Sequence, residues 1–128
     1  MTAQRILVVE DNEKNLKLVR DVLQYRGYEI LEARTGEQGV EVALAFLPHL
    51  VLMDLQLPGI NGERAFQLIR DNERTSRIPI VALTASAMKN DRARVLQAGF
   101  DGYLDKPISV RALPDQVLQF LNREEPPR

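Results

Sequence analysis

The amino-acid sequence predicts an α/β fold, a doubly wound (βα)5 arrangement with a five-stranded parallel sheet. Short apolar runs alternate with longer amphipathic stretches along all 128 residues, three of these runs contain no polar residue, and no repeat or linker interrupts the pattern. Strict alternation of strands and helices demands a parallel sheet with helices on both faces. We therefore expect one domain that fills residues 1–128.

Five short runs have the composition of strands. They lie at residues 6–9, 28–33, 50–53, 80–83 and 102–105. The runs at 6–9 and 50–53 are wholly apolar, which is typical of strands that are buried on both faces. The run at 28–33 alternates between polar and apolar residues, so we expect it nearer an edge of the sheet.

The first two helices are indicated by apolar residues at helical spacing and by their end signals. Gly27 suits the position just after a helix, and Pro48 ends the second one. Thr35, followed three residues later by Gln38, resembles a capping box that opens the second helix. The expected apolar stripes are Leu16, Val19 and Leu23 in the first helix, and Val40, Ala43, Leu44 and Leu47 in the second.

Three further helices are expected in the second half of the chain. The first follows a Pro-Gly turn, and the next spans about residues 88–98, ends at Gly99 and has few large apolar residues, so we expect loose packing. The last has Ser109 as its N-cap and Pro114 near its start. Residues 123–128 form a polar tail that we expect to be flexible. The apolar stripes are Ala65, Phe66 and Ile69 after the turn, and Val110, Leu113, Val117, Phe120 and Leu121 in the last helix.

Composition excludes several classes of protein. The chain has no cysteine, which rules out disulfide and thiolate chemistry. Its 17 Lys and Arg residues nearly balance 18 Asp and Glu residues, so it lacks the broad basic surface of a nucleic-acid-binding domain. The N-terminal segment is not a signal peptide, and no apolar run approaches the roughly 18 residues of a membrane span. We expect a cytoplasmic protein that binds neither nucleic acid nor membrane.

Polar residues follow four of the expected strands. Glu10 and Asp11 follow the first strand, Asp54 the third, Thr84 the fourth and Lys106 the fifth. Ligand sites of open α/β sheets lie beyond the carboxyl ends of the strands, so these side chains fall at one edge of the sheet. If the first and third strands are neighbours, three carboxylates converge there.

Converging carboxylates repel one another, and a divalent cation relieves that repulsion. Oxygen ligands without histidine or cysteine suit Mg²⁺. A carboxylate such as Asp54 can act as a nucleophile and form an aspartyl phosphate. Lys106 offers a positive charge and Thr84 a hydroxyl group to the oxygens of such a phosphate.

Each of these residues also has a simpler explanation. Glu10, Asp11 or Asn12 can stabilise the start of a helix, because anions and Asn side chains favour that end. Asp54 can belong to an ordinary turn, and Thr84 can cap a helix. The prediction of a phosphorylation site therefore depends on all four strand ends together.

Four segments of the sequence resemble bacterial response-regulator receiver domains. They are ILVVEDN at the start of the chain, LVLMDLQLPGINGE around Asp54, PIVALTA around Thr84 and GYLDKPI around Lys106. The similarity extends over nearly the whole chain, and residues 82–109 are especially similar to stand-alone regulators of the DivK type and to the receivers of hybrid kinases. No residue that the family requires is replaced.

This resemblance implies a flavodoxin-like fold with the strand order 2-1-3-4-5, an order that the residues alone do not give. It implies that Asp54 is the phosphoacceptor and that Lys106 pairs with the phosphoryl group. It also implies that Mg²⁺ is held by Glu10, Asp11, Asp54 and the backbone carbonyl of Gln56.

Further roles follow from the same resemblance. Thr84 binds a phosphoryl oxygen in the active state, and Tyr103 is the switch aromatic that turns inward when Thr84 moves. Gln56 and Ser86 stand where the family tunes the lifetime of the phosphate. The simpler interpretation of Tyr103 is a half-buried strand residue.

We therefore expect a phosphoacceptor of two-component or phosphorelay signalling, without a DNA-binding output domain. It is not an enzyme with a separate substrate, but assists its own Mg²⁺-dependent phosphorylation and dephosphorylation. The expected partners are a sensor histidine kinase or histidine phosphotransfer protein, and a downstream protein on the face of the fourth helix, fifth strand and last helix. We expect a monomer or weak homodimer.

Four alternatives remain to be compared with this prediction. A haloacid-dehalogenase-type phosphatase needs a second Asp two residues after the nucleophile, where this chain has Gln56. A flavodoxin-like cofactor binder needs a loop that holds phosphate after the first strand, where Glu10 and Asp11 repel it. An interaction module that works without phosphorylation and a receiver excised from a hybrid histidine kinase stay open.

Overall fold

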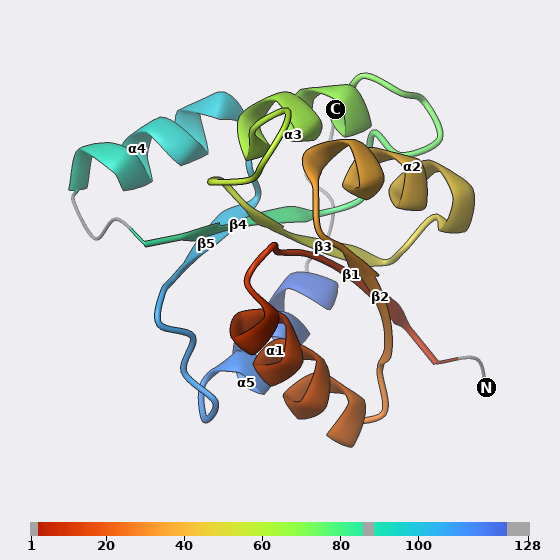
Figure 1. Ribbon diagram of the computed structural model, residues 1–128, viewed down its shortest axis with the longest axis vertical. Coiled ribbons are helices and arrows are strands. Elements are labelled where there is room, and N and C mark those ends of the chain that lie inside the picture. Colours follow the sequence, from red (N-terminus) through yellow and green to blue (C-terminus); the bar gives the residue numbers. More distant parts are fainter. Residues whose placement is uncertain (1–2, 86–88, 123–128) are drawn as a thin grey trace.

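The computed structural model describes residues 3–85 and 89–122, in which strands and helices alternate in the predicted order (Figure 1). The strands are β1 (Arg5–Val9), β2 (Glu29–Ala33), β3 (Leu50–Asp54), β4 (Ile80–Thr84) and β5 (Gly102–Asp105). The helices are α1 (Glu13–Tyr25), α2 (Gly36–Phe46), α3 (Gly62–Arg70), α4 (Lys89–Ala98) and α5 (Leu113–Leu121). Neighbouring strands pair in parallel in the order β2-β1-β3-β4-β5, which confirms the predicted fold class and strand order.

The sheet separates two hydrophobic cores, with α1 and α5 on one face and α2, α3 and α4 on the other (Figure 1). Successive residues of a strand point to opposite faces. In β1, Ile6 and Val8 therefore lie in the core under α1 and α5, whereas Leu7 and Val9 lie in the core under the other three helices. Interior strands need apolar residues at both kinds of position, and β2 lies at the edge, as its alternating pattern predicted.

Asn and Thr side chains begin the first two helices. Asn12 accepts hydrogen bonds from two backbone N–H groups at the start of α1, so the acids before it, Glu10 and Asp11, do not serve as the cap. Thr35 caps α2 as predicted, because its Oγ1 accepts from the N–H of Gln38 at 3.0 Å. The Gln38 side chain bonds back to the N–H just before the cap, in a variant of the predicted capping box.

The predicted start of the last helix is wrong. α5 begins at Leu113 after Ala112, which makes no side-chain capping bond. Ser109 Oγ instead accepts from the Ala112 N–H at 3.2 Å, and its carbonyl accepts from the Leu113 N–H at 3.0 Å, which closes a turn just before the helix. Pro114 has no N–H to bond the Val110 carbonyl, so this turn does not continue into the helix. Val110 is consequently 50% exposed and does not belong to the apolar stripe.

The end of α2 differs slightly from its apolar pattern. The helix ends at Phe46, and Leu47 is left-handed, with φ of 50° and 39% of its surface exposed. The ring of the following Pro48 disfavours helical backbone at the residue before it.

Two predictions about the fold fall outside the residues that the structure describes. They concern Met88 as the start of the fourth helix and the flexible tail at residues 123–128, and both stay predictions. Within 3–85 and 89–122, the helices are too short and too polar to serve as transmembrane segments.

Candidate phosphorylation site

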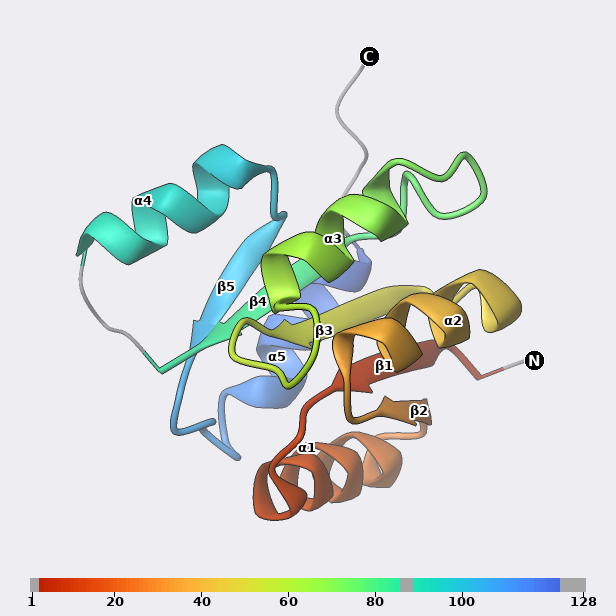
Figure 2. The same cartoon turned by 45° about the horizontal axis from the view of Figure 1, so that its top comes forward.

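The predicted site residues meet at the carboxyl edge of the sheet. Glu10 follows β1, Asp54 ends β3, Thr84 ends β4 and Lys106 follows β5. The strands β1, β3, β4 and β5 are consecutive neighbours in the sheet, so their ends lie side by side (Figure 2). The sheet order therefore positions these four side chains before any specific contact is considered.

Three carboxylates form the acidic part of the site. Glu10, Asp11 and Asp54 each offer a carboxylate oxygen within 4.8 Å of the others. Glu10 is 1% exposed and Asp54 is 4% exposed, whereas Asp11 lies at the surface. The cluster is thus closed on the side of the sheet and open to solvent beside Asp11.

Lys106 connects two of these carboxylates. Its Nζ donates a hydrogen bond to Asp54 Oδ2 at 2.7 Å and lies 2.8 Å from Glu10 Oε1 as an ion pair without hydrogen-bond alignment. Its backbone N–H donates to the Thr84 carbonyl at 2.8 Å, which joins it to the end of β4. Burial opposes the charge of this amine, but Asp54 and Glu10 raise the pKa of Lys106 above its usual value.

The two buried carboxyl groups have opposite pKa shifts. Burial first, and then the neighbouring Asp54, raise the pKa of Glu10 to about 7. Burial also disfavours the charge of Asp54, but Glu10, Lys106 and the Gln56 N–H together lower the pKa of Asp54. Glu10 is therefore the group that takes up a proton when no cation is present, and Asp54 stays ionised, as a nucleophile must.

The backbone after β3 also contributes to the site. The N–H of Gln56 donates to Asp54 Oδ1 at 2.9 Å, so each oxygen of the Asp54 carboxylate has a hydrogen-bond donor. Gly62, at the start of α3, lies so close that an added Cβ would be 2.3 Å from the Asp54 carbonyl oxygen. Two donors thus orient the Asp54 side chain, and the backbone of Asp54 lies close against the start of α3.

A cleft of about 350 Å³ opens beside Asp54. The residues that line it are Asp54, Leu55, Gln56, Asn61, Glu63, Leu83, Thr84, Ala85 and Arg94. Thr84 was predicted here and is 6% exposed. Sequence reasoning missed Asn61, Glu63 and Arg94, because the first two follow a turn as an ordinary cap and first-turn acid and Arg94 belongs to a mostly polar helix.

The remaining predicted residues have less distinctive positions. Tyr103 is half-buried in β5 and packs against the core under α2, α3 and α4, which agrees with its simpler interpretation and leaves its switching role a prediction. Ser86 lies outside the described residues.

The donor set fits a magnesium ion. Both carboxylate oxygens of Glu10 are buried and have no hydrogen-bond partner among the described residues, as expected of ligands that need a cation. All available donors are oxygens, and the cluster is open beside the exposed Asp11, where Mg²⁺ would keep its waters.

Comparison with known proteins agrees with this geometry. The family described as "Response regulator receiver domain" matches residues 6–118. The polar-differentiation response regulator DivK of Brucella ovis is 40% identical over 116 residues, which cover 91% of this chain and 94% of DivK.

Solved structures with the same fold include a receiver domain with a bound metal. The receiver domain of a sensor histidine kinase from Pseudomonas aeruginosa PAO1, with a magnesium ion coordinated in its active-site cleft, has a TM-score of 0.87 and 36% identity, and the match covers 95% of this chain and 100% of that one. The chemotaxis response regulator CheY4 of Vibrio cholerae also has a TM-score of 0.87, with 23% identity over 93% of this chain and 99% of its own, and supports the fold alone. The chain therefore belongs to the response-regulator receiver domains, as a DivK-like phosphoacceptor of two-component signalling.

Proposed function

We propose that Asp54 is the residue that accepts the phosphoryl group, from a phosphohistidine on a sensor histidine kinase or histidine phosphotransfer protein. The observation that carries this proposal is the environment of Asp54, which is buried, ionised and open to a cleft on one side. Lys106 and the Gln56 N–H orient its two oxygens. A fixed, charged carboxylate is the arrangement that nucleophilic attack requires.

The reaction is an in-line transfer. A carboxylate oxygen of Asp54 attacks phosphorus and forms the new O–P bond, while the N–P bond of phosphohistidine breaks and its electron pair stays on the imidazole nitrogen. Lys106 stabilises negative charge on the transferred group, and the Thr84 hydroxyl donates to one of its oxygens. Thr84 ends β4, which is next to β3, and Lys106 follows β5 on the far side of β4, so both approach the group from the same side of β3.

Glu10, Asp11, Asp54 and the backbone carbonyl of Gln56 would hold Mg²⁺. When bound, the ion neutralises charge on the transferring phosphoryl group. The Glu10 oxygens, which are buried without a hydrogen-bond partner among the described residues, and the magnesium ion in the Pseudomonas aeruginosa relative support this assignment.

The domain uses this chemistry as a switch and not as an enzyme with a separate substrate. It assists its own phosphorylation and dephosphorylation, and Gln56 and Ser86 tune the lifetime of the phosphate. Attraction of Thr84 to the phosphoryl dianion and rotation of Tyr103 alter the face formed by α4, β5 and α5, which a downstream protein then reads. One receiver domain fills residues 1–128 and works in the cytoplasm, as a monomer or weak homodimer that binds no nucleic acid.

Phosphorylation by acetyl phosphate tests the proposal. With Mg²⁺, we expect wild-type protein to gain the mass of one phosphoryl group and Asp54→Asn to gain none, because the amide lacks the nucleophilic oxygen. Intact-mass spectrometry measures the gain. Asp71→Asn, which changes an exposed aspartate after α3, is the matched control and should be phosphorylated like wild type. Equal gain in Asp54→Asn, or none in wild type, would contradict the proposal and favour a module that works without phosphorylation.

A further inference from the structure

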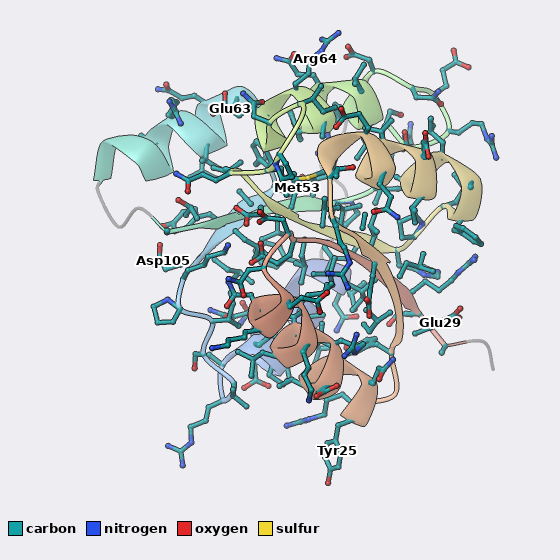
Figure 3. The ribbon with its side chains drawn as sticks, viewed as in Figure 1. Tyr25, Glu29, Met53, Glu63, Arg64 and Asp105 are labelled. Atoms are coloured by element: carbon teal, nitrogen blue, oxygen red, sulfur yellow. The ribbon has the colours of Figure 1, made fainter. Side chains whose placement is uncertain are left out.

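The cleft beside Asp54 has an arginine in its wall. Among the described residues that line the cleft, Arg94 of α4 is the only one with a positive charge. Its Nη2 lies 3.1 Å from Oε1 of Glu63, in the first turn of α3. In Figure 2, α3 and α4 flank the end of β4, and Figure 3 labels Glu63 between these two helices. The ion pair therefore joins the two helices beside the site.

We propose that Arg94 is a phosphoryl-binding residue of this site, which Glu63 holds in the unphosphorylated state. When Asp54 carries a phosphoryl group, the guanidinium exchanges the Glu63 carboxylate for a phosphoryl oxygen. This inference rests on the proposed role of Asp54. The inference adds Arg94, which the sequence pattern did not indicate, to the residues that take part in the same chemistry.

The charges around Asp54 favour this exchange. A phosphoryl group on Asp54 enters the cleft, because Asp54 lines it, and there it meets the wall that contains Arg94. Lys106 is not part of the cleft lining and already contacts both Glu10 and Asp54. Besides the Thr84 hydroxyl, Arg94 is therefore the charged donor in the lining for a phosphoryl oxygen that faces the cleft, and a planar guanidinium suits phosphate oxygens better than an ammonium group.

The Glu63–Arg94 pair is weak enough to exchange. The side chains of Arg94 and Glu63 are 63% and 41% exposed, and ion pairs of this exposure contribute about 0–1 kcal/mol. A phosphoryl dianion has more charge than a carboxylate and offers three acceptor oxygens to the guanidinium. The dianion therefore competes successfully for the arginine, and the exchange links the phosphorylated state to the position of α4.

Two variants with opposite expected effects test the inference. We expect Arg94→Gln to shorten the half-life of the phosphorylated protein about fivefold, the size of one exposed charge-assisted contact. Glu63→Gln releases Arg94 and should lengthen the half-life by a similar factor. After phosphorylation with acetyl phosphate and Mg²⁺, the donor is removed and the phosphorylated fraction is followed by intact mass, at low and high ionic strength. Salt should reduce both effects, which a purely structural role would not predict.

Arg64→Gln is the matched control, because it removes an exposed arginine of α3 that does not line the cleft (Figure 3). It should have the half-life of wild type. If Arg94→Gln has the same half-life as Arg64→Gln, or if Glu63→Gln shortens the half-life as Arg94→Gln does, the inference is wrong and the pair only joins the helices. If wild-type protein gains no phosphate at all, the proposed role of Asp54 has failed and this inference fails with it.

Discussion

The carboxyl group of Glu10 combines a buried position with a highly charged neighbourhood. It is 1% exposed, lies beside the ionised Asp54 and has Lys106 as its only counter-charge among the described residues. Its pKa of about 7 follows from this environment. Because the cluster needs a cation to keep Glu10 ionised, proton and metal compete for the same residue.

This competition predicts how stability depends on pH in metal-free protein. The pKa of Glu10 is about 7 in the folded state and 4.5 when unperturbed, so the folded state holds an extra proton between these values. Its stabilisation is present below pH 4.5 and is lost as pH rises through 7. At about 1.4 kcal/mol per pKa unit, we expect the free energy of unfolding to fall by on the order of 3 kcal/mol across this range. Urea denaturation in EDTA measures this fall.

Substitution separates Glu10 from other titrating groups. Glu10→Gln should remove most of the fall in the free energy of unfolding with pH. Glu29→Gln, on the exposed edge strand, should retain this fall (Figure 3). The lowered pKa of Asp54 affects stability only below pH 3.8, and the raised pKa of Lys106 affects it only above pH 10.5. Neither group therefore changes the free energy of unfolding between pH 4.5 and 7. If the free energy of unfolding of Glu10→Gln still falls with pH by as much as that of wild type, other residues cause the effect.

The residues at the strand ends could be predicted from sequence because a parallel sheet brings its carboxyl ends together whatever the details of packing. Asp54, Thr84 and Lys106 needed only the apolar runs before them to be recognised. Glu63 and Arg94 could not be found this way, because their contact depends on how α3 and α4 pack against each other. No local pattern in the sequence encodes that distance.

At the scale of elements, one arginine connects three segments at the far end of α3. Arg70 donates to the carbonyl oxygens of Ser76 and Ile78 and to Asp101 Oδ2, at 2.7, 2.9 and 2.7 Å. Asp101 Oδ2 also accepts from the Ile80 N–H at 2.8 Å. The start of β4 and the loop between α4 and β5 are thus fastened to α3.

We expect Arg70→Met to lower the free energy of unfolding by about 2 kcal/mol, because two partly buried carbonyls lose a donor and the Asp101 carboxylate loses its charged partner. Urea denaturation measures the change, provided that the m value, the slope of the free energy of unfolding against urea concentration, is the same for both proteins. Arg64→Met, on the exposed side of the same helix, is the control and should change stability by less than about 0.5 kcal/mol. Equal effects of the two substitutions would show that the network adds nothing beyond the loss of an arginine.

Element types followed from sequence more reliably than element ends. Buried strands and amphipathic helices have periodic patterns over many residues, and these patterns survive single exceptions. The start of α5 was misplaced because Ser109 does form a capping bond, but to a turn that Pro114 separates from the helix. Whether a cap begins a helix or only a turn depends on a backbone bond several residues later.

For the whole molecule, Mg²⁺ should act as a stabilising ligand. Binding to the folded state alone adds about 2.7 kcal/mol to the free energy of unfolding at a concentration 100 times the Kd. We expect the melting temperature of wild-type protein to rise with Mg²⁺ concentration and to return to its starting value in EDTA. Differential scanning fluorimetry measures the shift. Asp11→Asn should need more Mg²⁺ for the same shift, whereas Asp71→Asn should match wild type, and equal responses would argue against Asp11 as a ligand.

The two cores described above share no side chains, since each strand residue points to one face or the other. Repacking beneath α4 therefore leaves the packing of α1 against the sheet intact, apart from the backbone of the sheet itself, even when the face formed by α4, β5 and α5 changes. A protein docked on the constant side need not dissociate when the other side reorganises. Such a molecule can serve two kinds of binding partner at once. One kind binds it in both states, and the other binds only after phosphorylation.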